Sequence, residues 1–206
     1  MRHSVLITVI FLILGSSFSA EAAEPMEDLK GPIEQVIRTL QDPKYNDPAM
    51  KDQQRLEIMS LITNVFNFNE ISKRSLGLHW RKFSVQERQV FEEAFADFLG
   101  YTYFKKVRDS YQGENVIFLS QEKMSENKAL VKTKIPRKNS EIPLDYRMVR
   151  MKNKWYVYDV IIEGVSLVKN YRTQFNQILG KESPEQLIDR LRKKIVEQRE
   201  NDKTSS

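Results

Sequence analysis

The chain has 206 residues, of which 33 are Lys or Arg and 28 are Asp or Glu, and it contains no cysteine. Without cysteine, the chain cannot form disulfides, use a thiol nucleophile or carry the lipid anchor of a bacterial lipoprotein. The net charge of +5 favours anionic lipid head groups or acidic protein surfaces as partners, and it is equally consistent with a simple gain in solubility.

The first 22 residues have the pattern of a secretory signal peptide. Arg2 and His3 precede an apolar run over residues 5–14, and Ala20-Glu21-Ala22 matches the small-residue cleavage pattern. Because the apolar run is too short to span a bilayer comfortably, we favour a cleaved signal peptide over a membrane anchor. We therefore expect residues 1–22 to be removed near Ala22 and a soluble, exported protein to remain, which argues against nucleic acid as a partner.

Helical patterns fill the next part of the chain, residues 26–110. Asp47-Pro48 is a typical start for a helix that runs to about Phe66. A short helix is expected from Asn69 to Leu76. Ser84 and Glu87 form a capping-box pattern at the start of a longer helix that runs to about Arg108.

Strand patterns follow over residues 116–162. The expected strands are Val116–Gln121, Ala129–Ile135, Ile142–Met151 and Trp155–Ile162. Asn153-Lys154 indicates a hairpin turn between the last two strands, although the favoured glycine is absent. The third strand alternates apolar and polar residues, so we expect one of its faces to be buried and the other to be partly wet.

Two further helices are expected over residues 165–197. Gly180 ends the first of them, and Ser183-Pro184 begins the second. Residues 198–206 have the composition of a polar, loose tail. Helices, then strands, then helices indicate one α+β domain, residues 23–197, with helices laid over one face of an antiparallel sheet.

Several kinds of catalytic site lack the residues they need. After cleavage of the signal peptide, His79 is the only histidine, so a Ser–His–Asp triad would have to use it. A zinc site would need carboxylates around that single imidazole. The sequence has no phosphate-binding loop of the usual glycine-rich kind. We interpret His79 as a structural or surface residue, and we expect no metal site and no cofactor.

Polar residues gather where the fourth strand meets the next helix. Asp159 and Glu163 could act as paired acids, but four positions along a strand place them roughly 13 Å apart. A carboxylate beside the first turn of the following helix can instead accept its free N–H groups. Ser166 can serve as the N-cap and Gly164 can supply the bend. We therefore favour a structural corner over a catalytic pair.

The residues of this corner resemble a known family. The stretch Trp155–Phe175, WYVYDVIIEGVSLVKNYRTQF, is similar to the signature of the MlaC family, the toluene-tolerance auxiliary proteins of an ABC transport system. A second stretch, FNFNEISKRSLGLHW from Phe66 to Trp80, agrees with it. Asn69 departs from the family pattern, which often has aspartate at this position. The resemblance extends over nearly the whole chain after the signal peptide.

The resemblance implies a function and an architecture. It implies a periplasmic phospholipid carrier, not an enzyme, that moves lipid between an outer-membrane lipoprotein–porin complex and an inner-membrane ABC transporter complex. Such transport maintains the lipid asymmetry of the outer membrane. The implied fold is a twisted antiparallel sheet of about four strands covered by helices, NTF2-like in outline. An apolar slot between the two layers would hold the acyl chains of a bound phospholipid.

On this reading, the slot is lined by apolar residues of the long helix, of the inward strand faces and of the helix after the corner. The expected lining residues are Phe91, Phe95, Phe98, Leu99, Tyr103, Val131, Ile135, Leu144, Tyr146, Val160, Tyr171 and Phe175. The many aromatic residues fit a lipid slot, but they fit an ordinary aromatic core as well.

Two other functions stay open at this point. An exported enzyme on an NTF2-like cone could use Asp159 or Glu163 as a general base and a tyrosine or His79 as an acid. A non-catalytic adapter could bind an acidic protein through its last helix, which carries a basic cluster. The residues of this basic cluster are Arg190, Arg192, Lys193 and Lys194.

Overall fold

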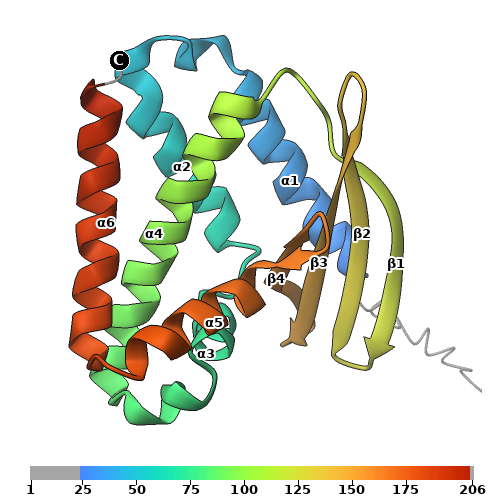
Figure 1. The fold of residues 1–206 in the computed structure, drawn as a ribbon. Helices are drawn as coiled ribbons and strands as arrows, with labels where there is room; N and C mark the ends of the chain where they lie inside the picture. The colour runs from blue at the N-terminus through green and yellow to red at the C-terminus, as the bar shows by residue number, and fades with distance from the viewer. Residues whose placement is uncertain (1–23, 205–206) are drawn as a thin grey trace, which may run out of the picture.

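The structure is a computed structural model that describes residues 24–204. The expected signal peptide and its cleavage site lie outside the described residues. Helices surround one side of a five-stranded sheet whose strands follow one another in chain order, all antiparallel (Figure 1). This arrangement confirms the α+β prediction of an antiparallel sheet covered by helices.

The helices are bounded as follows: α1 Pro25–Gln41, α2 Lys51–Thr63, α3 Phe68–Leu76, α4 Val85–Ser110, α5 Leu167–Leu179 and α6 Pro184–Thr204. Short 3-10 turns η1 Pro43–Tyr45, η2 Pro48–Met50 and η3 Gly77–Lys82 connect some of them. The strands are β1 Ile117–Ser125, β2 Lys128–Pro136, β3 Glu141–Met151, β4 Lys154–Ile162 and β5 Val165–Ser166.

The helix starts follow the capping chemistry expected from the sequence. At α4, the Ser84 N–H donates to the Glu87 carboxylate (2.7 Å) and the Glu87 N–H donates to the Ser84 hydroxyl (3.2 Å). The Asp47 side chain accepts the Ala49 N–H (2.9 Å), although the α-helix itself starts only at Lys51, after the turn η2. These bonds satisfy backbone donors that have no partner inside the helix.

Several boundaries differ from the sequence-based expectation, and strand β1, for example, runs to Ser125 and not to Gln121. Helix α1 lies inside the region 26–110 that was expected to be helical, but it was not expected as a separate element, and it continues through Pro32. Helix α6 continues to Thr204, so the expectation of a loose tail after Glu197 is wrong. The β3–β4 turn consists of Lys152 and Asn153, one residue earlier than expected, and both residues have left-handed φ angles of 49° and 64°.

The apolar side chains form two separate cores. The helical core joins α3, α4, α5 and α6 and includes Phe91, Phe95 and Leu187. The sheet core lies between α1 and the inner face of the sheet and includes Leu29, Val131 and Met148. The Asp28 carboxylate accepts the Trp155 N–H (2.8 Å), which fixes α1 to the start of β4.

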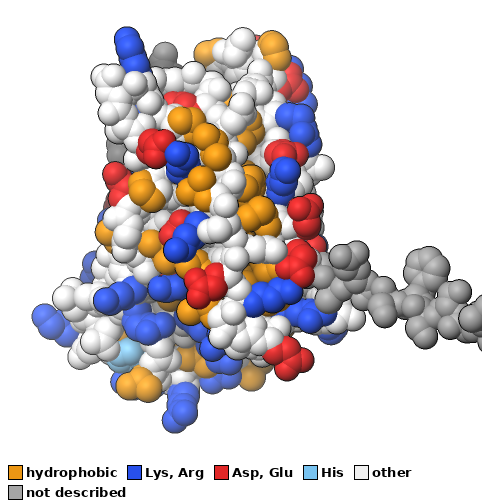
Figure 2. All heavy atoms as spheres, turned by 90° about the vertical axis from the view of Figure 1, so that its right-hand side faces the viewer, with side chains coloured by type: hydrophobic (Ala, Val, Ile, Leu, Met, Phe, Trp, Pro, Cys, Tyr) orange, Lys and Arg blue, Asp and Glu red, His pale blue; other side chains and the backbone are white. Residues whose placement is uncertain are grey.

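Within residues 24–204, no helix layer covers the outer face of the sheet (Figure 1). Figure 2 shows this side of the molecule, where a band of hydrophobic side chains is flanked by Lys, Arg, Asp and Glu. Strand β1 forms one edge of the sheet and is exposed along most of its length. Its pairing with β2 shifts register at Phe118/Ser120 and at Lys123/Ser125, which makes this edge irregular.

Candidate functional site

An apolar cavity of about 290 Å³ lies where the helical core and the sheet core meet. Helices α1, α2 and α4 form one wall, and strands β2, β3 and β4 form the other. From the first wall come Ile33, Val36, Ile37, Leu40, Ile58, Met59, Ile62, Leu99, Gly100, Tyr103, Phe104, Val107 and Ser110. From the strands come Ile135, Leu144, Tyr146, Asp159, Val160 and Ile162, with Arg137 just past the end of β2.

Connecting segments complete the lining. Phe66, Phe68, Ile71 and Leu167 lie on the side of α3 and α5, and Tyr111, Glu114 and Val116 come from the segment between α4 and β1. Phe66 is held in place because residues 65–67 run beside β4. The Asn67 N–H donates to the Val157 carbonyl, and the Val157 N–H donates to the Val65 carbonyl (2.8 Å each).

The side chains that line the cavity differ in burial from those of the two cores. Val36, Ile37 and Met59 are only partly buried, whereas Phe91 and Val131 are completely buried. On α1, the apolar residues Ile33, Val36, Ile37 and Leu40 recur at helical spacing and face the cavity. The wall therefore presents aliphatic surface that no protein atom covers, which is what an apolar ligand requires.

The β4–α5 corner has a defined hydrogen-bond pattern around Asp159, which is 3% exposed. The Asp159 carboxylate accepts the Val168 N–H (3.0 Å), the Ser166 hydroxyl (2.6 Å) and one N–H of Arg147 (3.0 Å). Ser166 is the N-cap of α5, and its hydroxyl accepts the Lys169 N–H (3.0 Å). The carboxylate therefore fixes the first turn of α5 to the end of the sheet.

Glu163 and Gly164 form the tight turn between β4 and β5. Both have left-handed φ angles, 49° and 82°, and both are exposed. The Glu163 N–H donates to the Pro143 carbonyl (3.0 Å) on the neighbouring strand. Asp159 lines the cavity and Glu163 does not. The structure thus separates the two carboxylates that the sequence could have paired for acid–base chemistry.

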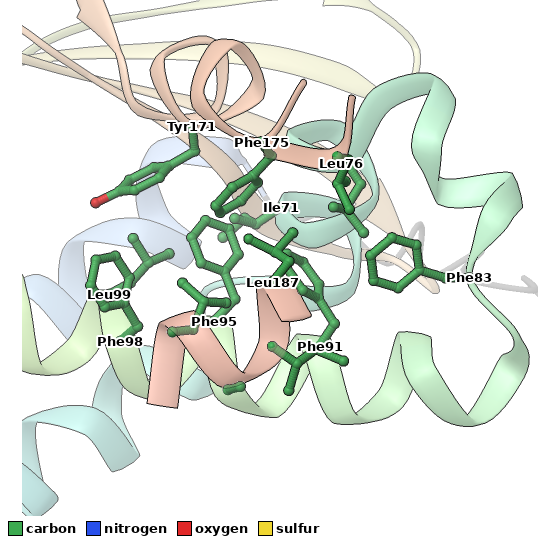
Figure 3. Close-up of a cluster of buried hydrophobic side chains, with 14 of the residues drawn as sticks. Ile71, Leu76, Phe83, Phe91, Phe95, Phe98, Leu99, Tyr171, Phe175 and Leu187 are labelled. Atoms are coloured by element: carbon green, nitrogen blue, oxygen red, sulfur yellow. The ribbon is translucent and has the colours of Figure 1, made fainter. Parts of the chain in front are cut away.

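Six of the twelve expected lining residues lie on the cavity wall. These are Leu99, Tyr103, Ile135, Leu144, Tyr146 and Val160. Of the other six, Val131 packs in the sheet core, and five aromatic residues pack in the helical core (Figure 3). These five are Phe91, Phe95, Phe98, Tyr171 and Phe175.

The aromatic residues of the helical core contact one another directly. The ring of Phe95 lies 5.1 Å from the rings of both Tyr171 and Phe175, in edge-to-face geometry. Phe91 meets Phe175 at 5.6 Å in the same way. Edge-to-face pairs at these distances are typical of a filled core. These side chains join α4 to α5.

Helices α1 and α2 contribute lining residues that the sequence did not predict. Seven apolar residues of these two helices line the cavity: Ile33, Val36, Ile37, Leu40, Ile58, Met59 and Ile62. The helical period of residues 29–40 was a usable signal, but the Gly31-Pro32 pair obscured it. Segment 47–66 was expected to be helical, but its apolar face could not be assigned to a cavity.

Burial changes the acidity of three tyrosines near the cavity. Desolvation raises the pKa of the Tyr146 phenol, which is deeply buried on β3. Desolvation is also the main reason that the pKa values of Tyr103 and Tyr171 are raised. All three phenols are therefore neutral at physiological pH, and the wall carries no phenolate charge.

Neither metal chemistry nor a histidine-based triad finds support in residues 24–204. That part of the chain holds no cluster of three or more His, Cys, Asp or Glu side chains suited to a metal ion. The Nε2 atom of His79 lies 2.9 Å from the Asn176 side-chain oxygen, so His79 pairs with an amide. None of the helices in the same residues has the length and apolar character needed to cross a bilayer.

The basic cluster of the last helix lies on its exposed side. Leu191 and Ile195 face the helical core, and the four basic residues point away from it. Arg190 pairs with the Glu182 carboxylate, and Arg192 lies 3.8 Å from Asp189. Two of the four charges are therefore partly compensated, and none of the four residues lines the cavity.

The fold matches a solved structure closely. The chain aligns with a phospholipid-binding protein from Ralstonia solanacearum, solved in complex with a phospholipid, with a TM-score of 0.74. The alignment covers 85% of this chain and 99% of that protein at 20% sequence identity, so the likeness establishes the fold. No curated protein matches the chain.

The sequence also matches a family model. The model is described as MlaC protein, and the match covers residues 30–193. This range includes the long helix α4, all five strands, the corner and α5. Because the match extends over most of the 206 residues, the chain belongs to the MlaC family.

Proposed function

We propose that this protein is a carrier of phospholipid that binds acyl chains in the cavity between the helices and the sheet. The observation that carries the proposal is the cavity itself, with about 290 Å³ of space and an almost entirely aliphatic and aromatic wall. An apolar cavity of about 150 Å³ already accommodates benzene. A cavity about twice that size provides room for an alkyl chain.

The energetics of such a ligand favour a carrier. Each buried methylene contributes about 0.8 kcal/mol, so a chain of about 15 methylenes contributes roughly 12 kcal/mol before opposing terms. A lipid held in this way leaves for water very slowly. It must pass directly into another apolar site, and the carrier must therefore dock on the proteins that load and unload it.

Family membership and the phospholipid complex of the Ralstonia solanacearum protein support the nature of the cargo. We propose that the protein works in the periplasm, after export by its signal peptide. Its partners in this proposal are an inner-membrane ABC transporter complex and an outer-membrane lipoprotein–porin complex. Moving phospholipid between them would maintain the asymmetry of the outer membrane.

No observation favours either alternative over this proposal. The Asp159 carboxylate, a candidate general base in the enzyme hypothesis, accepts three hydrogen bonds from the corner, which suits a structural role. The basic cluster of α6 could serve an adapter, but the same charges could steer a carrier toward acidic partners. The adapter hypothesis gives the cavity no role, and the enzyme hypothesis would place a substrate beside a carboxylate that the corner already engages.

The test is the lipid content of the protein purified without detergent. Native mass spectrometry should show a mass increase that disappears on organic extraction, and the extract should contain phospholipid. The extracted and refolded protein should then take up phospholipid from vesicles. If the native protein carries no lipid and the refolded protein takes up none, the carrier function is wrong.

A further inference from the structure

One end of the cavity is polar, and the rest of its wall is not. Ser110, Tyr111, Glu114 and Arg137 lie together at the ends of α4 and β2. The other charged residue on the wall, Asp159, is already engaged by the β4–α5 corner. An amphiphilic ligand therefore has one place where its polar group can leave the apolar wall.

Arg137 is held at this end by both its backbone and its side chain. Its backbone N–H donates to the Ser140 carbonyl (2.8 Å), which closes the turn between β2 and β3. Its Nη1 atom donates to the Ser110 carbonyl (2.6 Å) at the end of α4 and to the Glu114 carboxylate. These contacts restrict the guanidinium to one position before any ligand arrives.

The guanidinium still has donors to offer. In residues 24–204, both hydrogen bonds of the Arg137 side chain come from Nη1. The edge formed by Nε and Nη2 is therefore available, and the side chain is 20% exposed. Such an edge presents two parallel N–H groups that match two oxygens of a phosphate or a carboxylate.

We propose that this edge of Arg137 binds the phosphate of the lipid whose acyl chains fill the cavity. The inference rests on the proposed carrier function and adds to it the residue that recognises the head group. The cavity takes the apolar chains and Arg137 takes the anionic group, so the ligand enters in one orientation. A lipid with the same chains but no phosphate binds more weakly.

Glu114 sets the charge that this end accepts. Its carboxylate also accepts the Gln112 N–H (2.7 Å), so it is fixed beside Arg137 with 11% of its side chain exposed. Arg137 and Glu114 together carry no net charge. A phosphodiester with a single negative charge therefore fits better than a doubly charged phosphate monoester, which Glu114 repels more strongly.

The test compares two ligands with identical short acyl chains. Dihexanoylphosphatidylglycerol carries one phosphodiester, and dihexanoylglycerol carries none. Titration calorimetry of the delipidated full-length mature protein measures the affinity for each ligand. The parent should bind the phosphodiester lipid about 10-fold or more tightly than the neutral lipid, as a bidentate charge-assisted contact implies.

The variant Arg137→Gln should reduce the affinity for the phosphodiester lipid to that for the neutral lipid and leave the latter unchanged. Lys138→Gln is the matched control, since it removes the same charge from the adjacent, exposed residue of the same turn. It should keep the preference of the parent. Arg137→Lys keeps the positive charge but lacks the two parallel N–H donors, so it should retain only part of the preference. This variant replaces Arg137→Gln in the test if Arg137→Gln does not fold.

Three results would overturn the inference. One is equal binding of the two lipids by the parent, and another is an unchanged preference in a folded Arg137 variant. The third is tight binding of inorganic phosphate alone, which would make this end a site for free anions. If neither lipid binds to the folded parent, the carrier function itself fails, and this outcome is distinct from the other three.

Discussion

At the scale of single residues, Asp159 shows how the corner is stabilised. Its buried carboxylate accepts bonds from the backbone of α5, from the N-cap hydroxyl and from Arg147 on the neighbouring strand. A buried acceptor with three donors is costly to replace, because each donor would lose its partner. The corner is therefore a point where one side chain joins a helix to a sheet.

The first prediction concerns this corner. Asp159→Asn should lower the free energy of unfolding by about 2 kcal/mol or more, since the amide cannot accept all three bonds. Ser166→Ala should cost about 1 kcal/mol, as the loss of an N-cap does. Glu163→Gln, in the exposed turn, should be nearly neutral. Urea unfolding of the three variants measures these differences.

Lipid content and transfer activity provide the second readout for the corner variants. A folded Asp159→Asn or Ser166→Ala protein with parental stability and bound lipid, but with no activity, would point to chemistry at the corner. We expect activity to follow stability instead.

The second prediction concerns pH. Burial raises the pKa of Tyr146 above its unfolded value of 10.0, so above pH 10 the unfolded state loses this proton first. Stability due to this group is present below pH 10 and falls as the pH rises further. Thermal melts between pH 8 and 11 should show a steeper decline for the parent than for Tyr146→Phe. Identical slopes would show that this phenol does not titrate in this way.

At the scale of elements, the position of α2 beside α4 depends on a glycine. A Cβ atom at Gly100 would overlap the sulfur and the terminal methyl group of Met59 on α2. Both residues line the cavity. The absence of a side chain at Gly100 thus lets Met59 lie against α4 and keeps the cavity open.

The third prediction follows from this contact. Gly100→Ala should displace Met59 into the cavity and reduce lipid content, while the better helix propensity of alanine offsets part of the strain. Gly31→Ala on α1, where a Cβ meets nothing within 4 Å apart from its chain neighbours, is the matched control and should leave lipid content unchanged. Lipid quantification after purification compares the two, and equal lipid content would contradict the prediction.

The fourth prediction distinguishes the wall of the cavity from the sheet core. Leu144→Trp on β3 should be tolerated in the lipid-free protein, because the indole can occupy the cavity, but it should exclude lipid. Val131→Trp lies on the same sheet face in the filled sheet core and should cost about 1–3 kcal/mol or more. Thermal unfolding with and without phospholipid measures both effects.

The parent protein is the reference for the tryptophan variants. It should gain stability from phospholipid through mass action, and Leu144→Trp should lose that gain. If the two variants are equally destabilised without lipid, the face around Leu144 is filled in solution and the cavity must lie elsewhere.

Local patterns predicted most of the elements. The alternation in β3, the capping box at Ser84 and the strand-to-helix change at Ser166 all depend on neighbouring residues, so the sequence reveals them. The cavity depends on contacts between distant elements. Phe95 and Tyr103 are aromatic residues of the same helix, yet Phe95 is completely buried in the helical core, whereas Tyr103 packs against that core only partly buried and also lines the cavity. Only the position of α1 and α2 separates these two roles.

At the scale of the whole molecule, the protein has two packed hydrophobic cores and one apolar cavity. The helical core joins α3 to α6, and the sheet core joins α1 to the strands. The cavity lies where the two cores meet, so a ligand that fills it would contact members of both, such as Leu99 of the helical core and Tyr146 of the sheet core.

The cavity also makes the molecule sensitive to hydrostatic pressure. An empty apolar space adds to the volume of the folded state and disappears on unfolding, so pressure favours the unfolded chain. The fifth prediction is that the lipid-free protein unfolds at lower pressure than the lipid-loaded protein, by more than their difference in thermal stability implies. Fluorescence of the buried Trp155 under pressure reports the transition. A carrier that has delivered its cargo would then be the more compressible form, and refilling would return it to the incompressible state of an ordinary protein interior.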